Sequence, residues 1–304
     1  ATGTGTFIVE AIAVIYKTMT AKWEKQGKGE QEINRLWNEY VPKHLLPRLY
    51  GYELMMAPYA IAHMKIGLKL FETGYKFMSD ERVRVYLTNS LEPPSDAQQK
   101  LVGIVPALAH EAEAVNEVKR KVRFTVVVGN PPYSKIGRNM GEWATNFIKL
   151  NYIDDVPIQS YYEVDGAPLN EKKVWLQDDY VKFLRLSQYY IRQSNIGIYG
   201  YITNRGFLGN PTFNGMRQSL LQTFNHIYII DLHGDTNVGE QSPDGEPDQN
   251  VFDIQQGVAI SLGVRRSCRN ESMYLMFSEL WGARDKKYCF LMKDHSRIPQ
   301  KPTS

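Results

Sequence analysis

Alternation of strand and helix patterns constrains this chain more than any other feature. Between residues 48 and 265, short runs rich in β-branched and aromatic residues alternate with segments whose apolar residues recur at helical spacing. Strands separated by helices pair in parallel, so the pattern predicts an α/β fold with a mostly parallel, doubly wound sheet. The expected strands cover residues 48–54, 83–89, 124–129, 197–204, 226–233 and 256–265. The last two have no expected helix between them and predict an antiparallel hairpin at one edge of the sheet.

The expected strand at 124–129 is nearly all apolar, as a strand buried on both faces should be. It is followed at once by Asn130-Pro131-Pro132-Tyr133. Open α/β sheets bind their ligands at the carboxyl ends of strands, which is where this tetrapeptide falls. The two prolines lack N–H groups and leave carbonyls as pure acceptors, and the Asn130 side chain adds another acceptor oxygen.

Two converging acceptors suit a planar NH₂ group. The lone pair of such a nitrogen is delocalised, so the nitrogen is a poor nucleophile until both hydrogens are held and the lone pair is directed at an electrophile. The Tyr133 ring offers a flat face on which a planar substrate can stack. A strand-ending turn with a surface tyrosine is the structural alternative; we favour the catalytic interpretation.

The sequence begins with a glycine-rich turn before the apolar helical segment 7–25. Its residues are Ala1, Thr2, Gly3, Thr4 and Gly5. Glycines at such a place let a ligand approach the backbone and the helix N-terminus. No Lys-Ser or Lys-Thr pair directly follows Gly5, which excludes a P-loop. The turn should follow a strand, so we expect a further strand upstream of Ala1.

Glu53, beside Leu54, ends the next expected strand. An acidic residue at this place commonly binds ribose hydroxyls. A surface glutamate is the open alternative for Glu53, and a plain turn is the alternative for the glycines.

These three motifs, in this order, resemble the S-adenosylmethionine (SAM)-dependent N6-adenine DNA methyltransferases of the gamma arrangement. The stretch 1–7 matches their first cofactor motif from its alanine onward, Glu53 matches their ribose-binding acid, and Asn130–Tyr133 matches their catalytic motif without departure. Their third motif, which contacts the cofactor adenine, falls at 83–91, where this chain has Asn89 in place of the usual Asp. The resemblance implies SAM as the cofactor. It would be bound by the turn residues, Glu53, Leu54 and Asn89.

Segments further along the chain look like the later motifs of Type ISP and related fused restriction–modification enzymes. They cover residues 180–190, 200–208, 217–234 and 250–258. The resemblance implies a methyltransferase module with nuclease and helicase parts upstream and a recognition domain downstream. It also implies double-stranded DNA as the substrate, with the target adenine flipped out of the duplex because its N6 amine is otherwise paired. Phe252 matches the aromatic residue that packs on this base, and an ordinary core phenylalanine is an equal alternative.

The expected domains are a methyltransferase domain at 1–265, with an insertion at about 134–177, and the start of a target-recognition region or C-terminal extension at 266–304. Residues 261–304 hold nine Lys or Arg against four Asp or Glu. Phosphate contacts and a solvated surface are both open for these basic residues. They include Arg265, Arg266, Arg269, Lys286 and Lys287. The net charge of +3 permits a nucleic-acid partner without requiring one.

Other charged and sulfur-containing stretches are expected to be structural. The segment from Asp231 to Asp253 has seven acidic residues and no Lys or Arg, which predicts a solvated acidic loop. The basic run Lys119–Lys121 is expected to complement a helix dipole. Met55, Met56 and Met64 are expected to fill the core, and the six histidines show no metal-ligand spacing.

Several classes of protein are excluded or disfavoured. No apolar run approaches the roughly 20 residues of a membrane span, and the sequence given shows no signal peptide, so we expect a soluble protein of the prokaryotic cytoplasm. A protein-glutamine methyltransferase shares the Asn-Pro-Pro-Tyr motif, but it lacks so long an insertion and such a C-terminal extension. A non-catalytic DNA-binding module with the same fold is disfavoured because the motif at 130–133 is intact.

Overall fold

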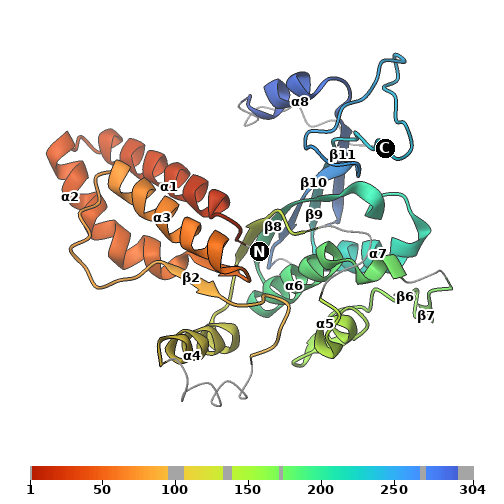
Figure 1. Ribbon diagram of the computed structural model, residues 1–304, viewed down its shortest axis with the longest axis horizontal. Coiled ribbons are helices and arrows are strands. Elements are labelled where there is room, and N and C mark those ends of the chain that lie inside the picture. The colour runs from red at the N-terminus through yellow and green to blue at the C-terminus, as the bar shows by residue number, and fades with distance from the viewer. Residues whose placement is uncertain (1, 95–105, 133–138, 171–173, 268–271, 294–304) are drawn as a thin grey trace. The chain divides into compact units, whose positions relative to one another are not determined.

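The computed structural model describes residues 2–94, 106–132, 139–170, 174–267 and 272–293. The chain divides into two compact units, Ala1–Val122 and Arg123–Ser304, which we call the first and second unit (Figure 1). Ala1, Tyr133 and Arg269 lie outside the described residues. No helix in the described part of the chain is long and apolar enough to cross a membrane.

The first unit combines helices with a short parallel sheet. Its elements are α1 (Thr6–Lys25), α2 (Glu30–Tyr40), β1 (Tyr50–Glu53), α3 (Met56–Glu72), β2 (Arg84–Leu87) and α4 (Pro106–Lys121). A π-helical turn (Val41–Leu45) and a 3₁₀ turn (Leu46–Arg48) lead from α2 into β1. The strands β1 and β2 pair in parallel. Apolar side chains of α1, α2 and α3 form the core, with Ile12, Trp37 and Ile66 buried among them.

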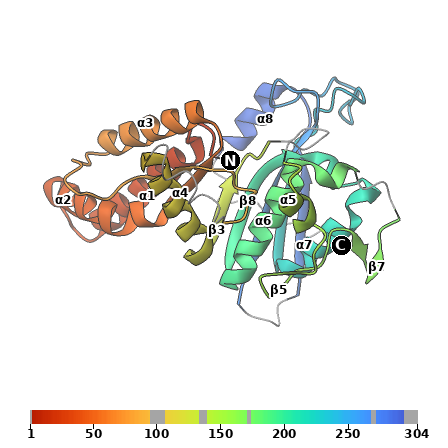
Figure 2. The same ribbon diagram turned by 60° about the horizontal axis from the view of Figure 1, so that its bottom comes forward.

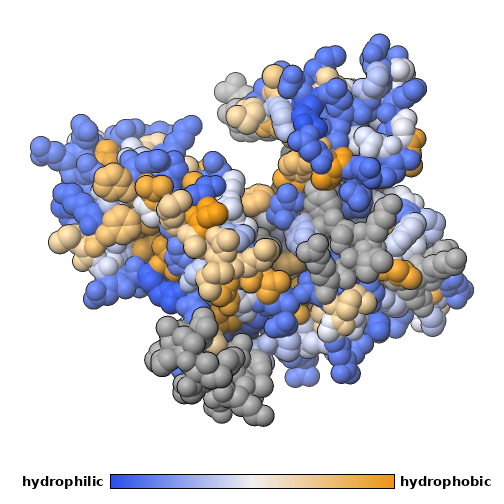
Figure 3. Space-filling view, in the orientation of Figure 1, coloured by the Kyte–Doolittle hydropathy of each residue, from blue (hydrophilic) through white to orange (hydrophobic). Residues whose placement is uncertain are grey.

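The outward face of α3 is apolar. Ile61, Met64, Leu68 and Phe71 recur at intervals of three or four residues and are all exposed. Figure 3 shows apolar residues gathered on the surface over this part of the chain. The prediction that Met64 and its neighbours Met55 and Met56 fill the core is therefore wrong. The core is filled by the opposite face of α3, which carries the buried Ala62, Ile66 and Leu70.

The second unit is built on a five-stranded mixed sheet with the order β11-β9-β10-β8-β3. Its strands are β3 (Val126–Gly129), β8 (Gly197–Asn204), β9 (His226–Asp231), β10 (Val258–Arg265) and β11 (Tyr274–Glu279). The pairs β3–β8 and β9–β11 are parallel, whereas β10 runs antiparallel to both β8 and β9. The α/β fold class is thus confirmed, and the carboxyl ends of β3, β8, β9 and β11 share one edge of the sheet.

Three details of the predicted sheet are wrong. The hairpin β9–β10 is antiparallel, but it lies inside the sheet because the unpredicted β11 pairs with the outer side of β9. The six expected strands are divided between the sheets of the two units. The strand β3 is not buried on both faces, since Val126 and Val128 are exposed. Among the described residues, β3 is the end strand of its sheet and pairs with β8 on one side only.

The remaining elements of the second unit surround this sheet, and α6 lies along β8 (Figure 2). They are α5 (Glu142–Phe147), the small hairpins β4–β5 (Tyr152–Ile153, Val156–Pro157) and β6–β7 (Glu163–Val164, Ala167–Pro168), α6 (Asp179–Ser194), α7 (Asn214–Thr223) and α8 (Arg284–Leu291). The strand β11 and helix α8 follow residue 265 and belong to the same compact unit. The boundary of a recognition region at residue 265 stays a prediction.

A buried arginine fixes the insertion to α6. The Arg185 guanidinium donates to the carbonyls of Phe147 at 3.2 Å, Gln159 at 2.8 Å and Ile158 at 3.1 Å, and also to that of Leu150. Burial lowers the pKa of Arg185 to about 10, which leaves it charged at neutral pH. One side chain thus satisfies four backbone groups of an irregular segment that has few ladder hydrogen bonds.

Replacing Arg185 with Met should therefore destabilise the protein strongly. The change keeps much of the side-chain volume but leaves four carbonyls without their charged donor, at a cost of about 3 kcal/mol or more. Urea unfolding of the variant measures this cost. The matched control is Arg192→Met, because Arg192 on the same helix is only half-buried and donates to the carbonyl of Pro157; about 1 kcal/mol is expected there. Equal stability of the two variants would contradict the assignment.

Candidate active site

The predicted catalytic asparagine lies at the carboxyl edge of the second unit's sheet. Gly129, the last residue of β3, pairs with Tyr201 of β8, and Asn130 follows directly. The Asn130 side chain is exposed and makes no hydrogen bond to any residue that the structure describes. Pro131 is buried and Pro132 is exposed. The amide of Asn130 is therefore available to a ligand on a backbone that β8 holds in place.

Asn139, the first described residue after Pro132, is anchored to the start of α6. Asn139 donates through its backbone N–H to Asp179 Oδ1 at 3.2 Å and through Nδ2 to Oδ2 at 2.9 Å. The ammonium of Lys182, a buried residue, donates to the Asn139 carbonyl at 2.5 Å. Burial lowers the pKa of Lys182, and the nearby Asp179 opposes this shift. The chain is thus held at Gly129 by β8 and at Asn139 by α6.

In the first unit, Glu53 holds the glycine-rich turn. Its Oε2 accepts from the Gly3 N–H at 2.7 Å, and its Oε1 accepts from the Met55 N–H at 3.0 Å. The Thr2 N–H bonds to the Tyr52 carbonyl at 2.8 Å, so the turn begins beside β1. Gly5 has φ 81° and lies so close to α3 that a Cβ would stand 3.1 Å from Ala62. The glycine at this position is therefore required both by the left-handed conformation and by the close packing.

The predicted adenine-contacting segment meets this turn at the ends of β1 and β2. The Thr88 N–H donates to the Glu53 carbonyl at 2.7 Å. Asn89 caps the following turn, with its Oδ1 accepting from the Leu91 N–H and its Nδ2 donating to Glu92. The structure therefore brings Gly3, Glu53 and Asn89 to one edge of the first unit.

Lys119 ties α4 to this edge. Its ammonium donates to the Asn89 carbonyl at 2.8 Å, to the Glu92 carbonyl at 2.9 Å and to Thr88 Oγ1 at 3.3 Å. Burial lowers the pKa of Lys119 to about 8. The main contacts of Lys119 are therefore with the turn at 88–92 and not with the end of its own helix. Lys121 pairs with Glu117 on the exposed side of α4, as expected for a solvated face.

Phe252 lies in the second unit and is half-buried. It packs against a small apolar cluster that contains Leu232, Val251 and Val258. Its backbone is fixed on both sides, since its N–H donates to Asn250 Oδ1 at 2.9 Å and its carbonyl accepts from Arg284 at 3.1 Å. The ring is thus partly a core residue, and its contact with a substrate stays a prediction.

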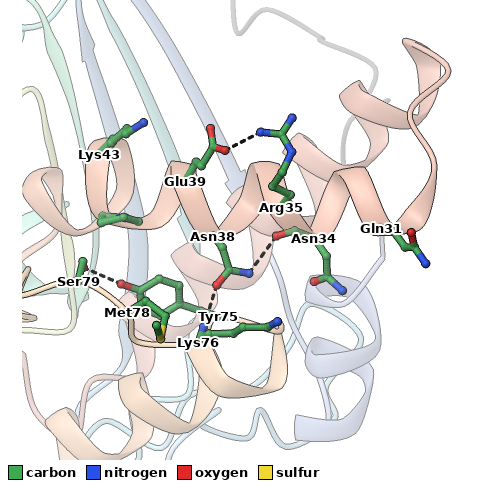
Figure 4. A pocket seen from close by; sticks show the side chains of 11 residues that line it. Gln31, Asn34, Arg35, Asn38, Glu39, Lys43, Tyr75, Lys76, Met78 and Ser79 are labelled. Atoms are coloured by element: carbon green, nitrogen blue, oxygen red, sulfur yellow. Dashed lines mark hydrogen bonds and ion pairs between the residues drawn. The ribbon is translucent and has the colours of Figure 1, made fainter.

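A separate cavity of about 500 Å³ lies between α2 and residues 75–79 in the first unit (Figure 4). It contains none of the predicted site residues. Asn38 on its wall bonds to the Asn34 carbonyl and to the Lys76 N–H, which joins α2 to the segment after α3. The residues that line this cavity therefore hold α2 and the segment after α3 together within the first unit.

The acidic segment after β9 is exposed over most of residues 236–247, as predicted for a solvated loop, but two of its seven acidic residues are not solvated. Asp231 and Asp248 are buried. Their counter-ions come from elsewhere in the chain: Arg205, just after β8, pairs with Asp231 and with Glu240, both at 2.7 Å. Counting charges within the segment could not reveal partners contributed by other elements.

Lys287 on α8 is the partner of Asp248. Both side chains are fully buried, and Nζ donates to Asp248 Oδ2 at 2.8 Å and to the carbonyls of Leu232 and Gln249, each at 2.7 Å. All three ammonium protons are therefore used inside the protein. Lys287 cannot contact phosphate from this position, whereas the neighbouring Lys286 is exposed.

Comparison with solved structures shows the class of this fold. A nuclease-deletion mutant of the Type ISP restriction-modification enzyme LlaGI, in complex with a DNA substrate mimic, matches with a TM-score of 0.70 and 21% identity over 95% of this chain and 22% of that chain. The ATP-dependent Type ISP restriction-modification enzyme LlaBIII bound to DNA matches with a TM-score of 0.67 and 25% identity, over 94% of this chain and 18% of that chain. The DrdV–DNA complex matches with a TM-score of 0.66 and 23% identity, over 99% of this chain and 26% of that chain. The chain has a fold that occurs in restriction–modification enzymes and spans about a quarter or less of these proteins.

The family follows from the sequence profile. Residues 48–238, more than half of the chain, match the Eco57I restriction-modification methylase profile, and the chain belongs to this family. No curated protein matches the chain. The resemblance to the methyltransferase modules of fused restriction–modification enzymes is confirmed.

The buried ion pair Lys287–Asp248 yields a stability prediction. Lys287→Met leaves the Asp248 carboxylate buried without its counter-ion and should cost about 3–5 kcal/mol. Removing both charges in Lys287→Met/Asp248→Leu should restore part of this loss. The exposed Lys286→Met is the control, with an expected change within about 0.5 kcal/mol. Urea unfolding measures all three, and a single Lys287 variant as stable as the control would refute the role of the pair.

Proposed function

We propose that this chain is the methyltransferase module of a restriction–modification protein and transfers a methyl group from SAM to N6 of adenine in a specific DNA site. The observation that carries the proposal is the exposed amide of Asn130 at the carboxyl edge of the sheet, in a chain of a restriction-modification methylase family. The solved relatives LlaGI, LlaBIII and DrdV are described with DNA or a DNA mimic, which supports DNA as the substrate.

The first unit fits a nucleoside-bearing cofactor. Each oxygen of the Glu53 carboxylate accepts one backbone N–H and keeps a lone pair for a ribose hydroxyl. The neighbouring Leu54 side chain is exposed and offers an apolar surface for a ring. We assign SAM binding to these residues together with the turn at 1–5 and Asn89. SAM supplies a methyl group on a sulfonium centre when bound.

The task of the second unit is to position the target amine. The Asn130 Oδ1 and a neighbouring backbone carbonyl of the motif accept the two hydrogens of the target amine. These two hydrogen bonds direct the nitrogen lone pair at the methyl group. Fixing this orientation beforehand lowers the barrier because no reorganisation is needed during the reaction. Tyr133 is assigned to stack on the adenine, and Phe252 to pack on it from the segment after β9.

The larger assembly and the alternatives follow from the same family. We infer fused or associated nuclease, helicase and recognition parts, and a prokaryotic cytoplasmic protein. A protein-glutamine methyltransferase would use the same asparagine, but the match to a restriction-modification methylase favours DNA. A non-catalytic DNA-binding module would have no use for an amide exposed in this way.

The direct test uses the protein with labelled SAM and double-stranded DNA, followed by nucleoside analysis of the product. N6-methyladenine is expected. Asn130→Ala should reduce methyl transfer about 100-fold or more, because the acceptor that orients the amine is lost. SAM binding should stay within about two-fold of wild type, since Asn130 is not among the cofactor residues.

Tyr133 supplies the matched control for this test. Tyr133→Phe keeps the ring and should be mild, whereas Tyr133→Ala should be severe because stacking is lost. Methylated glutamine in a protein with unmodified DNA would sink the proposed substrate. Near-normal turnover of Asn130→Ala would sink the proposed mechanism.

The lowered pKa of Lys119 predicts that cofactor binding depends on pH. With its pKa lowered to about 8, Lys119 is protonated below this pH and loses a proton as the pH rises through it. The neutral amine has only two donors for three acceptors, so the turn that carries Asn89 should loosen and SAM affinity should fall above pH 8. Lys119→Met should weaken binding at pH 7 several-fold and abolish this step. Lys121→Met is the control, and an unaltered pH profile in Lys119→Met would contradict the assignment.

A further inference from the structure

Three potential metal ligands meet at the carboxyl ends of β9 and β11. Asp231 ends β9, Glu279 ends β11, and the parallel register places the two residues opposite each other. His233 follows two residues after Asp231 in a left-handed conformation, with φ 52°. One ligand atom from each residue lies within 4.8 Å of the others. Spacing along the chain predicted no such group, because Glu279 comes from a different strand.

The state of His233 points to a missing positive charge. The side chain is buried, and its Nδ1 lies 2.8 Å from Glu240 Oε1, which fixes the proton on Nδ1. Among the described residues Nε2 has no hydrogen-bond partner, although Glu279 Oε1 is 3.2 Å away and Asp231 Oδ2 is 3.8 Å away. A lone pair that faces two carboxylate oxygens is repelled unless a cation lies between them.

Arg205 does not supply this charge by itself. It donates to both oxygens of Asp231, at 2.8 and 2.7 Å, and to Glu240 at 2.7 Å. One guanidinium therefore pairs with two carboxylates, those of Asp231 and Glu240. Glu279 beside His233 adds a third carboxylate, so the cluster keeps a negative excess. Carboxylate oxygens with a hydrogen bond from an arginine retain a lone pair for a metal ion, and such bonds orient metal ligands.

We propose that His233 Nε2, Asp231 and Glu279 bind a divalent transition-metal ion of the zinc type. Ligand atoms on a tetrahedral Zn²⁺ stand about 3.3 Å apart, close to the separations from Nε2. The contact between Nδ1 and Glu240 is the outer hydrogen bond that metal-bound histidines usually make to a carboxylate. Glu279 is half-exposed and gives the ion access from solvent.

The site is separate from the proposed catalytic amide. Three strand spacings separate β3 from β9 in the sheet, about 14 Å. The ion would join the ends of β9 and β11 to the acidic segment through Glu240. Its role is therefore structural, and the inference does not rest on methyl transfer.

The test is calorimetric titration of Zn²⁺ alone into the chelator-treated protein. One ion per chain is expected, with saturable binding. The Trp281 ring stacks on His233 with ring centroids 3.3 Å apart, so its fluorescence should change on binding. Co²⁺ should give the visible absorption of a tetrahedral site with nitrogen and oxygen ligands.

Variants locate the site. Glu279→Gln and His233→Gln should weaken binding at least 100-fold, and Glu240→Gln about 10- to 100-fold. Asp253→Asn is the control, since Asp253 is an exposed acid in the same segment and should leave the affinity unchanged. Glu279 is half-exposed, so its variant is expected to fold and keeps the test decisive if the His233 variant unfolds.

The rival explanation is a proton in place of the metal. A doubly protonated His233 held between Glu240 and Glu279, with Trp281 on its face, would also balance the charge. The treated protein would then bind no Zn²⁺, and this result would overturn the proposal. Binding that persists with unchanged affinity in Glu279→Gln would overturn it as well.

Discussion

The second unit depends on neutralising the carboxylates that it buries at the carboxyl edge of its sheet. An unpaired buried charge costs several kcal/mol, so each buried acid requires a partner that the fold must bring to it. Arg205 reaches Asp231 from the end of β8, and Lys287 reaches Asp248 from α8. These contacts join β8, β9, the acidic segment and α8, which are far apart along the chain.

The first unit uses the same physical means on a smaller scale. Glu53 accepts from two backbone N–H groups, and Lys119 donates to two carbonyls and a hydroxyl. Both satisfy backbone groups of turns that no strand ladder satisfies. A charged side chain that completes a turn also fixes the shape of that turn. The edge proposed to bind the cofactor is thus shaped by the two residues Glu53 and Lys119.

Local sequence patterns predicted where most strands and helices lie. The order of the strands in the sheet and the partners of the buried charges depend on tertiary contacts, which local patterns do not contain. The strand expected at 197–204 is β8, Gly197–Asn204, because its apolar alternation is a local property. The place of the hairpin β9–β10 depends on β11, which has no strong periodicity of its own and pairs across the sheet. Asn130 could be predicted as a site residue because its motif is contiguous, whereas Glu279, which lies beside His233, comes from another strand. The burial of Asp231 and Asp248 could not be predicted for the same reason, since their cationic partners lie outside the acidic segment.

The described residues after 265 stabilise the second unit. Arg284 on α8 donates to the carbonyls of Asn250 and Phe252 and pairs with Asp253. Lys287, one turn further along α8, holds the start of the same segment through Asp248. The backbone that carries the Phe252 ring is thus held in part by α8, a helix that follows β11. A substrate contact by Phe252 would depend on packing of α8 against this segment, which links the basic end of the chain to the proposed base-binding side of the sheet.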